Sequence, residues 1–240
     1  MIRTFIFFLF LWISLILSVL LFIPFFFLSI FHLQEIKKSF TYKVTSAWAS
    51  FVLFLGGVKI HVKGVKDPES DNLVIISNHQ GYMDIPVIMK VFPFPVSFIT
   101  KKELLKVPLI NLWMVVMDCI FIDRRSPVKA RRIIKNKLSD NNRNPVVIFP
   151  EGTRSRSEKT GRFKGGGLKL VYETKKRIQV VKISGTYKNY EEKGMITPGD
   201  IELNIFEVIP PDIYRRKDFQ NFKKMLHEMI SDQSFLNEKS

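Results

Sequence analysis

The sequence has only one cysteine, Cys119, in 240 residues. A single thiol cannot form a disulfide within the chain, which excludes a small scaffold stapled by disulfides. Cys119 lies in an apolar, strand-like context. We interpret it as a small buried hydrophobic residue and not as a reactive thiol.

Acidic residues are absent before Glu35, and residues 4–31 carry no charge of either sign. As one helix these 28 residues would be about 42 Å long, more than the roughly 30 Å core of a bilayer. Pro24 offers a cause for the excess, because it removes a backbone donor and disfavours the helical conformation of Ile23. Two arrangements remain open: a spanning helix over about residues 4–23 followed by a Phe-rich interfacial stretch, or a kinked, re-entrant segment with both ends on one face.

Apolar side chains then recur every three or four positions over residues 35–56, which predicts an amphipathic helix ended by Gly56 and Gly57. Trp48 and the lysines of this helix suit a lipid–water boundary, and a helix that faces an ordinary protein core is the alternative. Lysines follow the apolar segment, whereas Arg3 alone precedes it, so we expect the rest of the chain on the cytoplasmic face of the membrane. Residues 1–56 are thus predicted to form N-terminal membrane-anchoring helices, a two-helix membrane motif.

Positive charge dominates the remainder. Lys and Arg number 37 against 22 Asp and Glu, which gives a net charge of +15 and a pI near 9.9. The chain is nevertheless 46% hydrophobic, so it is not a disordered polycation. We find no nucleic-acid-binding motif and expect no nucleic-acid partner. An anionic membrane surface is the expected partner of this charge.

From Val58 onward, short apolar runs alternate with helical patterns, and residues 57–240 show no repeat and no internal boundary. This alternation predicts an α/β fold with a mixed, largely parallel central sheet flanked by helices. The predicted strands cover 58–63, 73–77, 96–100, 119–122, 145–149, 179–184 and 201–208, and the predicted helices cover 84–92, 108–117, 126–138, 164–175 and 214–231.

Two strand ends carry reactive side chains. NHQGYMD (78–84) follows one apolar strand, and a turn at Gly81 would let the carboxylate of Asp84 reach the imidazole of His79 and fix its tautomer. The spacing alone is weak evidence, since His227 and Asp232 repeat it on what we interpret as a solvated helix. EGTRS (151–155) follows another strand, where Arg154 offers a planar fork suited to phosphate.

These two motifs, with FIDRR (121–125) and FKGGG (163–167) in the same order and spacing, resemble the glycerolipid acyltransferase family. The resemblance covers about residues 57–210, and the N-terminal helices resemble the membrane-docking motif of that family. It implies transfer of a fatty acyl chain from an acyl thioester to the sn-2 hydroxyl of lysophosphatidic acid, giving phosphatidic acid. It further implies a catalytic domain over 57–240, no cofactor and no metal, with acyl-CoA or acyl-carrier-protein as co-substrate.

By the same resemblance His79 is the general base and Asp84 its orienting partner, and Lys101 gives a supporting phosphate or carbonyl contact. The positions that handle the acceptor's phosphate in the family fall on Arg124, Glu151, Gly152, Thr153 and Arg154. Backbone N–H groups near Gly81 or Gly152 are expected to stabilise the oxyanion. Two alternatives stay open: another lysophospholipid or a glycerol phosphate as acceptor, or a non-catalytic basic protein that binds anionic membranes.

Overall fold

The central strand shows how the chain builds two apolar layers. The computed structural model describes residues 1–67, 69–140 and 143–231, and in it β2 (Leu73–Ser77) is buried along its whole length. Leu73 and Ile75 belong to one hydrophobic cluster, whereas Val74 and Ile76 belong to another. Because successive side chains of a strand point to opposite faces, an unbroken apolar run suits a strand that is covered on both sides.

Within the described ranges the strands form one seven-stranded sheet in the order β1-β7-β6-β2-β5-β3-β4. Strands β6, β2, β5, β3 and β4 run parallel, β7 is antiparallel to β6, and β1 is parallel to β7. This confirms the predicted mixed, largely parallel sheet. The strands besides β2 are β1 (Val58–Gly64), β3 (Ser97–Lys101), β4 (Ile120–Ile122), β5 (Val146–Ile148), β6 (Arg177–Ser184) and β7 (Gly199–Ile205).

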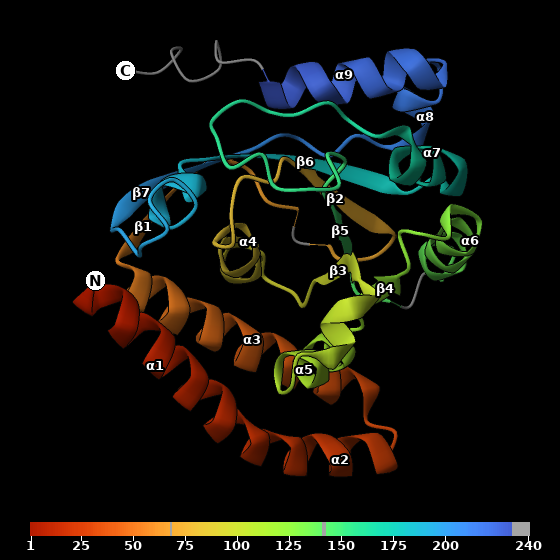
Figure 1. Ribbon diagram of the computed structural model, residues 1–240. Coiled ribbons are helices and arrows are strands. Elements are labelled where there is room, and N and C mark those ends of the chain that lie inside the picture. Colours follow the sequence, from red (N-terminus) through yellow and green to blue (C-terminus); the bar gives the residue numbers. More distant parts are fainter. Residues whose placement is uncertain (68, 141–142, 232–240) are drawn as a thin grey trace.

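Helices cover both faces of the sheet (Figure 1). On one face lie α3 (Gln34–Gly56) and α4 (Asp84–Val91), whose buried side chains join the cluster of Ile75. On the other lie α6 (Pro127–Leu138), α7 (Gly165–Thr174) and α9 (Phe219–Ser231), which join the cluster of Ile76. Shorter helical segments are η2 (Lys102–Lys106), α5 (Ile110–Val116), η3 (Thr186–Asn189) and α8 (Pro211–Tyr214).

One predicted helix is wrong in its extent. The sequence predicts a single helix over 214–231, and the structure divides this stretch into α8 and α9. The side chain of Asp218 accepts hydrogen bonds from the backbone N–H groups of Gln220 (2.8 Å) and Asn221 (2.9 Å). Asp218 therefore caps the start of α9, and the chain turns before it.

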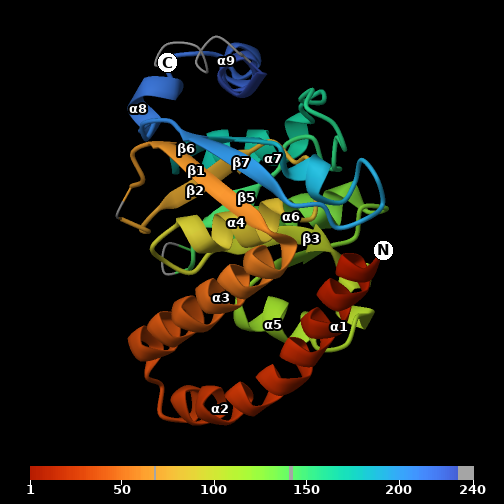
Figure 2. The same cartoon turned by 90° about the vertical axis from the view of Figure 1, so that its left-hand side faces the viewer.

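The apolar N-terminal segment is helical throughout, as α1 (Ile2–Leu17), the 3₁₀ turn η1 (Ser18–Leu21) and α2 (Phe22–Ile30). Of the described residues, this run alone is long and apolar enough to cross a membrane. Its direction changes between α1 and α2 (Figures 1 and 2). Pro24 explains the bend, because it has no N–H for the carbonyl of Leu20, which lies in the 3₁₀ turn.

After α2 the chain returns to the sheet through α3 (Figure 2), which ends at Gly57 in the left-handed conformation, φ 67°. The start of α1 lies beside the loop that precedes β7, because Thr4 Oγ1 accepts a hydrogen bond from Ile196 N at 3.0 Å. Phe7 on α1 and Val52 on α3 belong to the same buried cluster as Ile75 of β2.

The structure also gives Trp48 contacts within the protein. Its side chain is half-buried against the hydrophobic cluster, and its Nε1–H donates to Ser14 Oγ on α1 at 3.2 Å. One face of α3 therefore packs as an ordinary core-facing helix, which is the alternative that the sequence left open. The two-helix membrane motif and the boundary after residue 56 stay predictions.

Candidate active site

Four parallel strands deliver the predicted site residues to one edge of the sheet. His79 follows β2, Lys101 ends β3, Arg124 follows β4, and the EGTRS loop (151–155) follows β5. The carboxyl ends of neighbouring parallel strands meet at the same edge, which is where open α/β sheets form their sites. Residues that are far apart in the sequence are in this way brought together.

His79 and Asp84 meet across the turn between β2 and α4. His79 Nδ1 lies 2.6 Å from Asp84 Oδ2, and the two side chains are 19% and 0% exposed. The carboxylate oxygen accepts the hydrogen bond, so the hydrogen lies on Nδ1 and the lone pair of Nε2 is left available. The imidazole also stacks on the ring of Phe149, with centroids 4.2 Å apart and planes 16° apart, which fixes the plane of the base.

Asp84 is held by three further donors. Its Oδ2 accepts the backbone N–H groups of Gln80 (2.7 Å) and Gly81 (3.0 Å), and its Oδ1 accepts the hydroxyl of Thr186 at 2.5 Å. These hydrogen bonds compensate a carboxylate that has no contact with water. Thr186, on η3, was not predicted, although it lies in a glycine-containing turn after a strand, as the two predicted motifs do.

The amides of the two glycines near which oxyanion donors were expected already have partners in the fold. The N–H of Gly81 is directed to Asp84, and the N–H of Gly152 donates to Phe149 O at 3.0 Å. Both amides therefore serve the turns in which they lie. The glycines permit these turns, and Gly152 has a φ of 69° that a side chain would strain.

Glu151 lies beneath the His79 loop. Its carboxylate accepts the backbone N–H of His79 at 2.8 Å through Oε1 and that of Gly161 at 2.7 Å through Oε2. Burial raises the pKa of Glu151, and these two hydrogen bonds oppose the rise. The backbone joins the loops further, since Ser155 N donates to His79 O at 2.7 Å. Glu151 thus contacts main chain and holds the loop of the imidazole in place.

Cationic side chains gather at the open edge. Arg124 is exposed, and its Nη1 donates to Gly152 O at 2.6 Å, which joins the loops after β4 and β5. Lys101 and Thr153 are also exposed there. A Cβ added to Gly152 would lie 3.1 Å from Lys164 Nζ, so this ammonium group stands directly beside the loop. The arrangement favours an anionic ligand next to His79.

Arg154 projects from the same loop but pairs with a residue that sequence reasoning missed. Its Nη1 lies 3.0 Å from Glu191 Oε1, and its guanidinium carbon lies 3.7 Å from the centroid of the Tyr82 ring. Glu191 is in a YEEKG stretch that has no strand-end or motif signal. Only the folded chain brings it to this edge.

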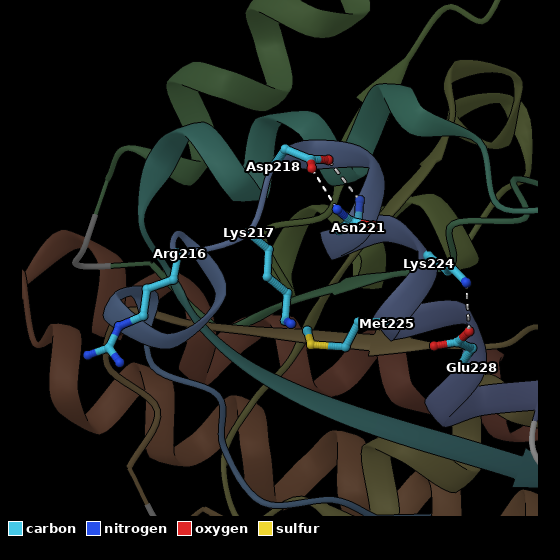
Figure 3. Close-up of a pocket in the computed structure, with 7 residues that line it drawn as sticks. All are labelled: Arg216, Lys217, Asp218, Asn221, Lys224, Met225 and Glu228. Carbon is cyan, nitrogen blue, oxygen red and sulfur yellow. Dashed lines mark hydrogen bonds and ion pairs between the residues drawn. The ribbon is translucent and has the colours of Figure 1, made fainter.

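Two other features lie outside this site. His227, which repeats the spacing of His79 with Asp232, contacts Phe163 and Ser231, and Asp232 is outside the described residues. A shallow hollow of about 420 Å³ lies between the α8–α9 turn and α9, and shares no residue with the strand-end loops (Figure 3). No group of three or more His, Cys, Asp or Glu residues that could hold a metal occurs in the described ranges.

Comparison with known proteins gives consistent matches. The family model described as Acyltransferase matches residues 59–184. A 1-acyl-sn-glycerol-3-phosphate acyltransferase of Borreliella burgdorferi is 31% identical over 75% of this chain and 72% of that protein. A probable enzyme of the same name from Mycoplasma genitalium is 29% identical over 82% of this chain and 77% of that protein.

The fold has a solved counterpart. The crystal structure of the 1-acyl-sn-glycerophosphate acyltransferase of Thermotoga maritima matches with a TM-score of 0.79 at 24% identity, over 100% of this chain and 98% of that one. The likeness extends from the sheet through the N-terminal helices and shows that the two chains share a fold.

Proposed function

The chain belongs to the acyltransferase family, and from this we propose that it transfers a fatty acyl chain from an acyl thioester to the sn-2 hydroxyl of 1-acyl-sn-glycerol-3-phosphate. The product is phosphatidic acid. The names of the relatives from Borreliella burgdorferi and Mycoplasma genitalium support this acceptor. The observation that carries the proposal is the hydrogen-bonded pair of His79 and Asp84 at an edge lined by cations.

In the proposed mechanism His79 is the general base. Asp84 holds the Nδ1–H, and Nε2 takes the proton of the sn-2 hydroxyl as its oxygen attacks the thioester carbonyl carbon. The new C–O bond forms, the C–S bond breaks, and the proton passes from Nε2 to the leaving thiolate. The products are an ester and a thiol, and because the hydroxyl attacks the thioester directly, this mechanism involves no acyl-enzyme.

The acceptor's phosphate would bind at the basic edge beside His79. Arg124 and Arg154 supply guanidinium groups, Lys101 a third cation, and Gly152 and Thr153 the loop between them. Glu151 takes part by accepting the backbone N–H groups of His79 and Gly161, because a carboxylate has no donor to offer a phosphate. The acyl donor is either acyl-CoA or acyl-carrier-protein, and no cofactor is required.

We place the enzyme on the cytoplasmic face of an anionic membrane. Its acceptor and product are lipids, and α1 and α2 expose apolar side chains such as Phe5 (69%) and Phe26 (62%). The chain leaves the sheet through α1 and returns to it through α3, which supports the re-entrant arrangement over a single crossing. Lysines after the segment, against Arg3 alone before it, support the cytoplasmic orientation.

Substitution of the base tests the proposal. With acyl-CoA or acyl-carrier-protein and lysophosphatidic acid, His79→Ala is expected to lower kcat by at least about 10²-fold, because general-base catalysis contributes that much. Vesicle binding should persist, and His227→Ala should retain wild-type turnover. Unchanged turnover in His79→Ala would refute the mechanism.

A panel of acceptors addresses the alternatives. Another lysophospholipid or glycerol 3-phosphate would outperform lysophosphatidic acid if the acceptor has been misassigned. A non-catalytic basic protein would bind anionic vesicles without turnover, and it has no need for the buried His79–Asp84 pair.

A further inference from the structure

The guanidinium group of Arg154 is fixed from two sides. Its carbon lies 3.7 Å from the centroid of the Tyr82 ring, and its Nη1 donates to Glu191 Oε1 at 3.0 Å. Stacking on the Tyr82 ring fixes the plane of the guanidinium group, and the ion pair with Glu191 restricts its rotation within that plane. Arginine has five N–H donors, so most of them remain for another acceptor.

Glu191 is well placed to hold this arrangement. Its side chain is only 3% exposed, and Oε1 also accepts the backbone N–H of Tyr82 at 2.7 Å. One carboxylate oxygen thus joins the arginine to the residue whose ring supports it. Tyr82 belongs to the turn between His79 and Asp84, so the position of Arg154 is tied to the position of the imidazole.

Stability does not explain why a carboxylate lies here. Glu191 Oε2 is buried and has no hydrogen-bond partner among the described residues. A Cβ added to Gly81 would come within 2.5 Å of this oxygen, so only the glycine leaves room for it. Burial raises the pKa of Glu191, and the half-satisfied anion is costly in the folded protein.

We propose that Glu191 is a positioning residue, which holds Arg154 on Tyr82 so that the remaining N–H donors face the phosphate of the acceptor. The inference rests on the proposed function, because that function supplies the phosphorylated acceptor. An arginine ordered before binding loses less conformational entropy when it binds. The benefit is confined to ligands that carry the phosphate.

A pair of ligands isolates that phosphate. Lysophosphatidic acid and the monoacylglycerol with the same acyl chain differ only in this group, and without an acyl donor neither is consumed. We would measure the dissociation constants of both in detergent micelles with the full-length wild-type chain, Glu191→Ala and Glu191→Gln. The ratio of the two constants reports the contribution of the phosphate.

Glu191→Ala is expected to weaken the binding of lysophosphatidic acid about two- to tenfold, which is the cost of ordering one long side chain. The binding of monoacylglycerol should be unchanged. Glu191→Gln keeps an oxygen for Arg154 and for the N–H of Tyr82, and should stay within about threefold of wild type. The control Glu192→Ala removes an equal charge from an exposed neighbouring side chain and should change neither constant.

Three results would overturn the proposal. Tighter phosphate binding in both variants would mean that Glu191 only weakens the local positive potential. If both ligands bound equally more weakly and the melting temperature fell, Glu191 would have a structural role only. An unchanged ratio would mean that Arg154 needs no support. Failure of the proposed function is seen separately, as absence of phosphatidic acid when the wild-type protein receives an acyl donor.

Discussion

The Asp84 carboxylate is the most highly coordinated group of the site. It is fully buried and accepts hydrogen bonds from His79, from the backbone of Gln80 and Gly81, and from Thr186. Hydrogen bonds to a charged group are stronger than those between neutral groups, and in a buried network each donor supports the others. The orientation of His79 therefore depends on side chains that never approach a substrate.

Thr186 is the test of this dependence. Thr186→Val keeps the shape of the side chain and removes the hydroxyl that donates to Asp84 Oδ1. We expect the free energy of unfolding to fall by about 1–3 kcal/mol and kcat to fall up to about tenfold, with KM little changed. Urea titrations and steady-state kinetics measure both. Thr186→Ser should restore them, and wild-type values in the valine variant would contradict the role.

Local patterns in the sequence place His79, Asp84 and Glu151 at strand ends, because a strand followed by a glycine-containing turn can be recognised without the fold. Thr186 shows the same pattern after β6 and could have been found. Glu191 could not, since its contact with Arg154 joins residues 37 positions apart, and Glu191 itself lies in a loop without a periodic pattern. The role of Glu151 also needed the fold, because the sequence does not say which way a carboxylate turns.

The sequence also left the path of α1, α2 and α3 undecided, because local patterns do not show which distant residues meet in the fold. Composition predicts that residues 4–31 are membrane-facing, but hydropathy carries no information on whether the chain crosses. The structure adds tertiary contacts that fix the path of these helices within the protein: Thr4 with Ile196, Ser14 with Trp48, and Ser18 with Trp113. These hydrogen bonds join α1 to α3 and to the loop before β7, and join η1 to α5.

A cysteine placed between α2 and α3 distinguishes the spanning arrangement of the apolar segment from the re-entrant one. Gln34 is exposed where α2 gives way to α3, and in a re-entrant segment Gln34→Cys lies on the same side of the membrane as the catalytic residues. We expect a membrane-impermeant maleimide to label it in inside-out vesicles. Labelling only in right-side-out vesicles would indicate a crossing.

The chain supplies its own controls for this measurement. Cys119 is buried, and burial raises the pKa of its thiol to about 11, so the wild-type protein is a suitable blank. The exposed Lys193, in the loop that carries Glu191, provides a reference as Lys193→Cys for the side of the catalytic domain.

The charge of +15 is distributed so that most cations lie on the surface, while three carboxylates of the site, those of Asp84, Glu151 and Glu191, have buried side chains. Burial raises the pKa of both Glu151 and Glu191 from the ordinary value of 4.5. Hydrogen bonds oppose the rise in both and do not cancel it. Each of the two anions thus lowers the stability of the folded chain at neutral pH, and the site retains them for the contacts that they make.

This leads to a pH dependence with a definite sign. Below pH 4.5 both the folded and the unfolded chain keep the proton of Glu191, and as the pH rises the unfolded chain loses it first. Stability due to this group is therefore lost between pH 4.5 and its raised folded pKa, and is constant above it. Glu191→Gln cannot lose that proton, so its free energy of unfolding relative to wild type should increase across this window and then level off.

Urea titrations in detergent from pH 4 to 8, taken as differences between variant and wild type, cancel the repulsion among the surface cations. Glu192→Gln removes the same charge from an exposed side chain and should give a difference that is flat with pH. A difference for Glu191→Gln that falls with rising pH would mean that the ion pair with Arg154 outweighs burial. The carboxylate would then stabilise the fold, and its retention would need no functional explanation.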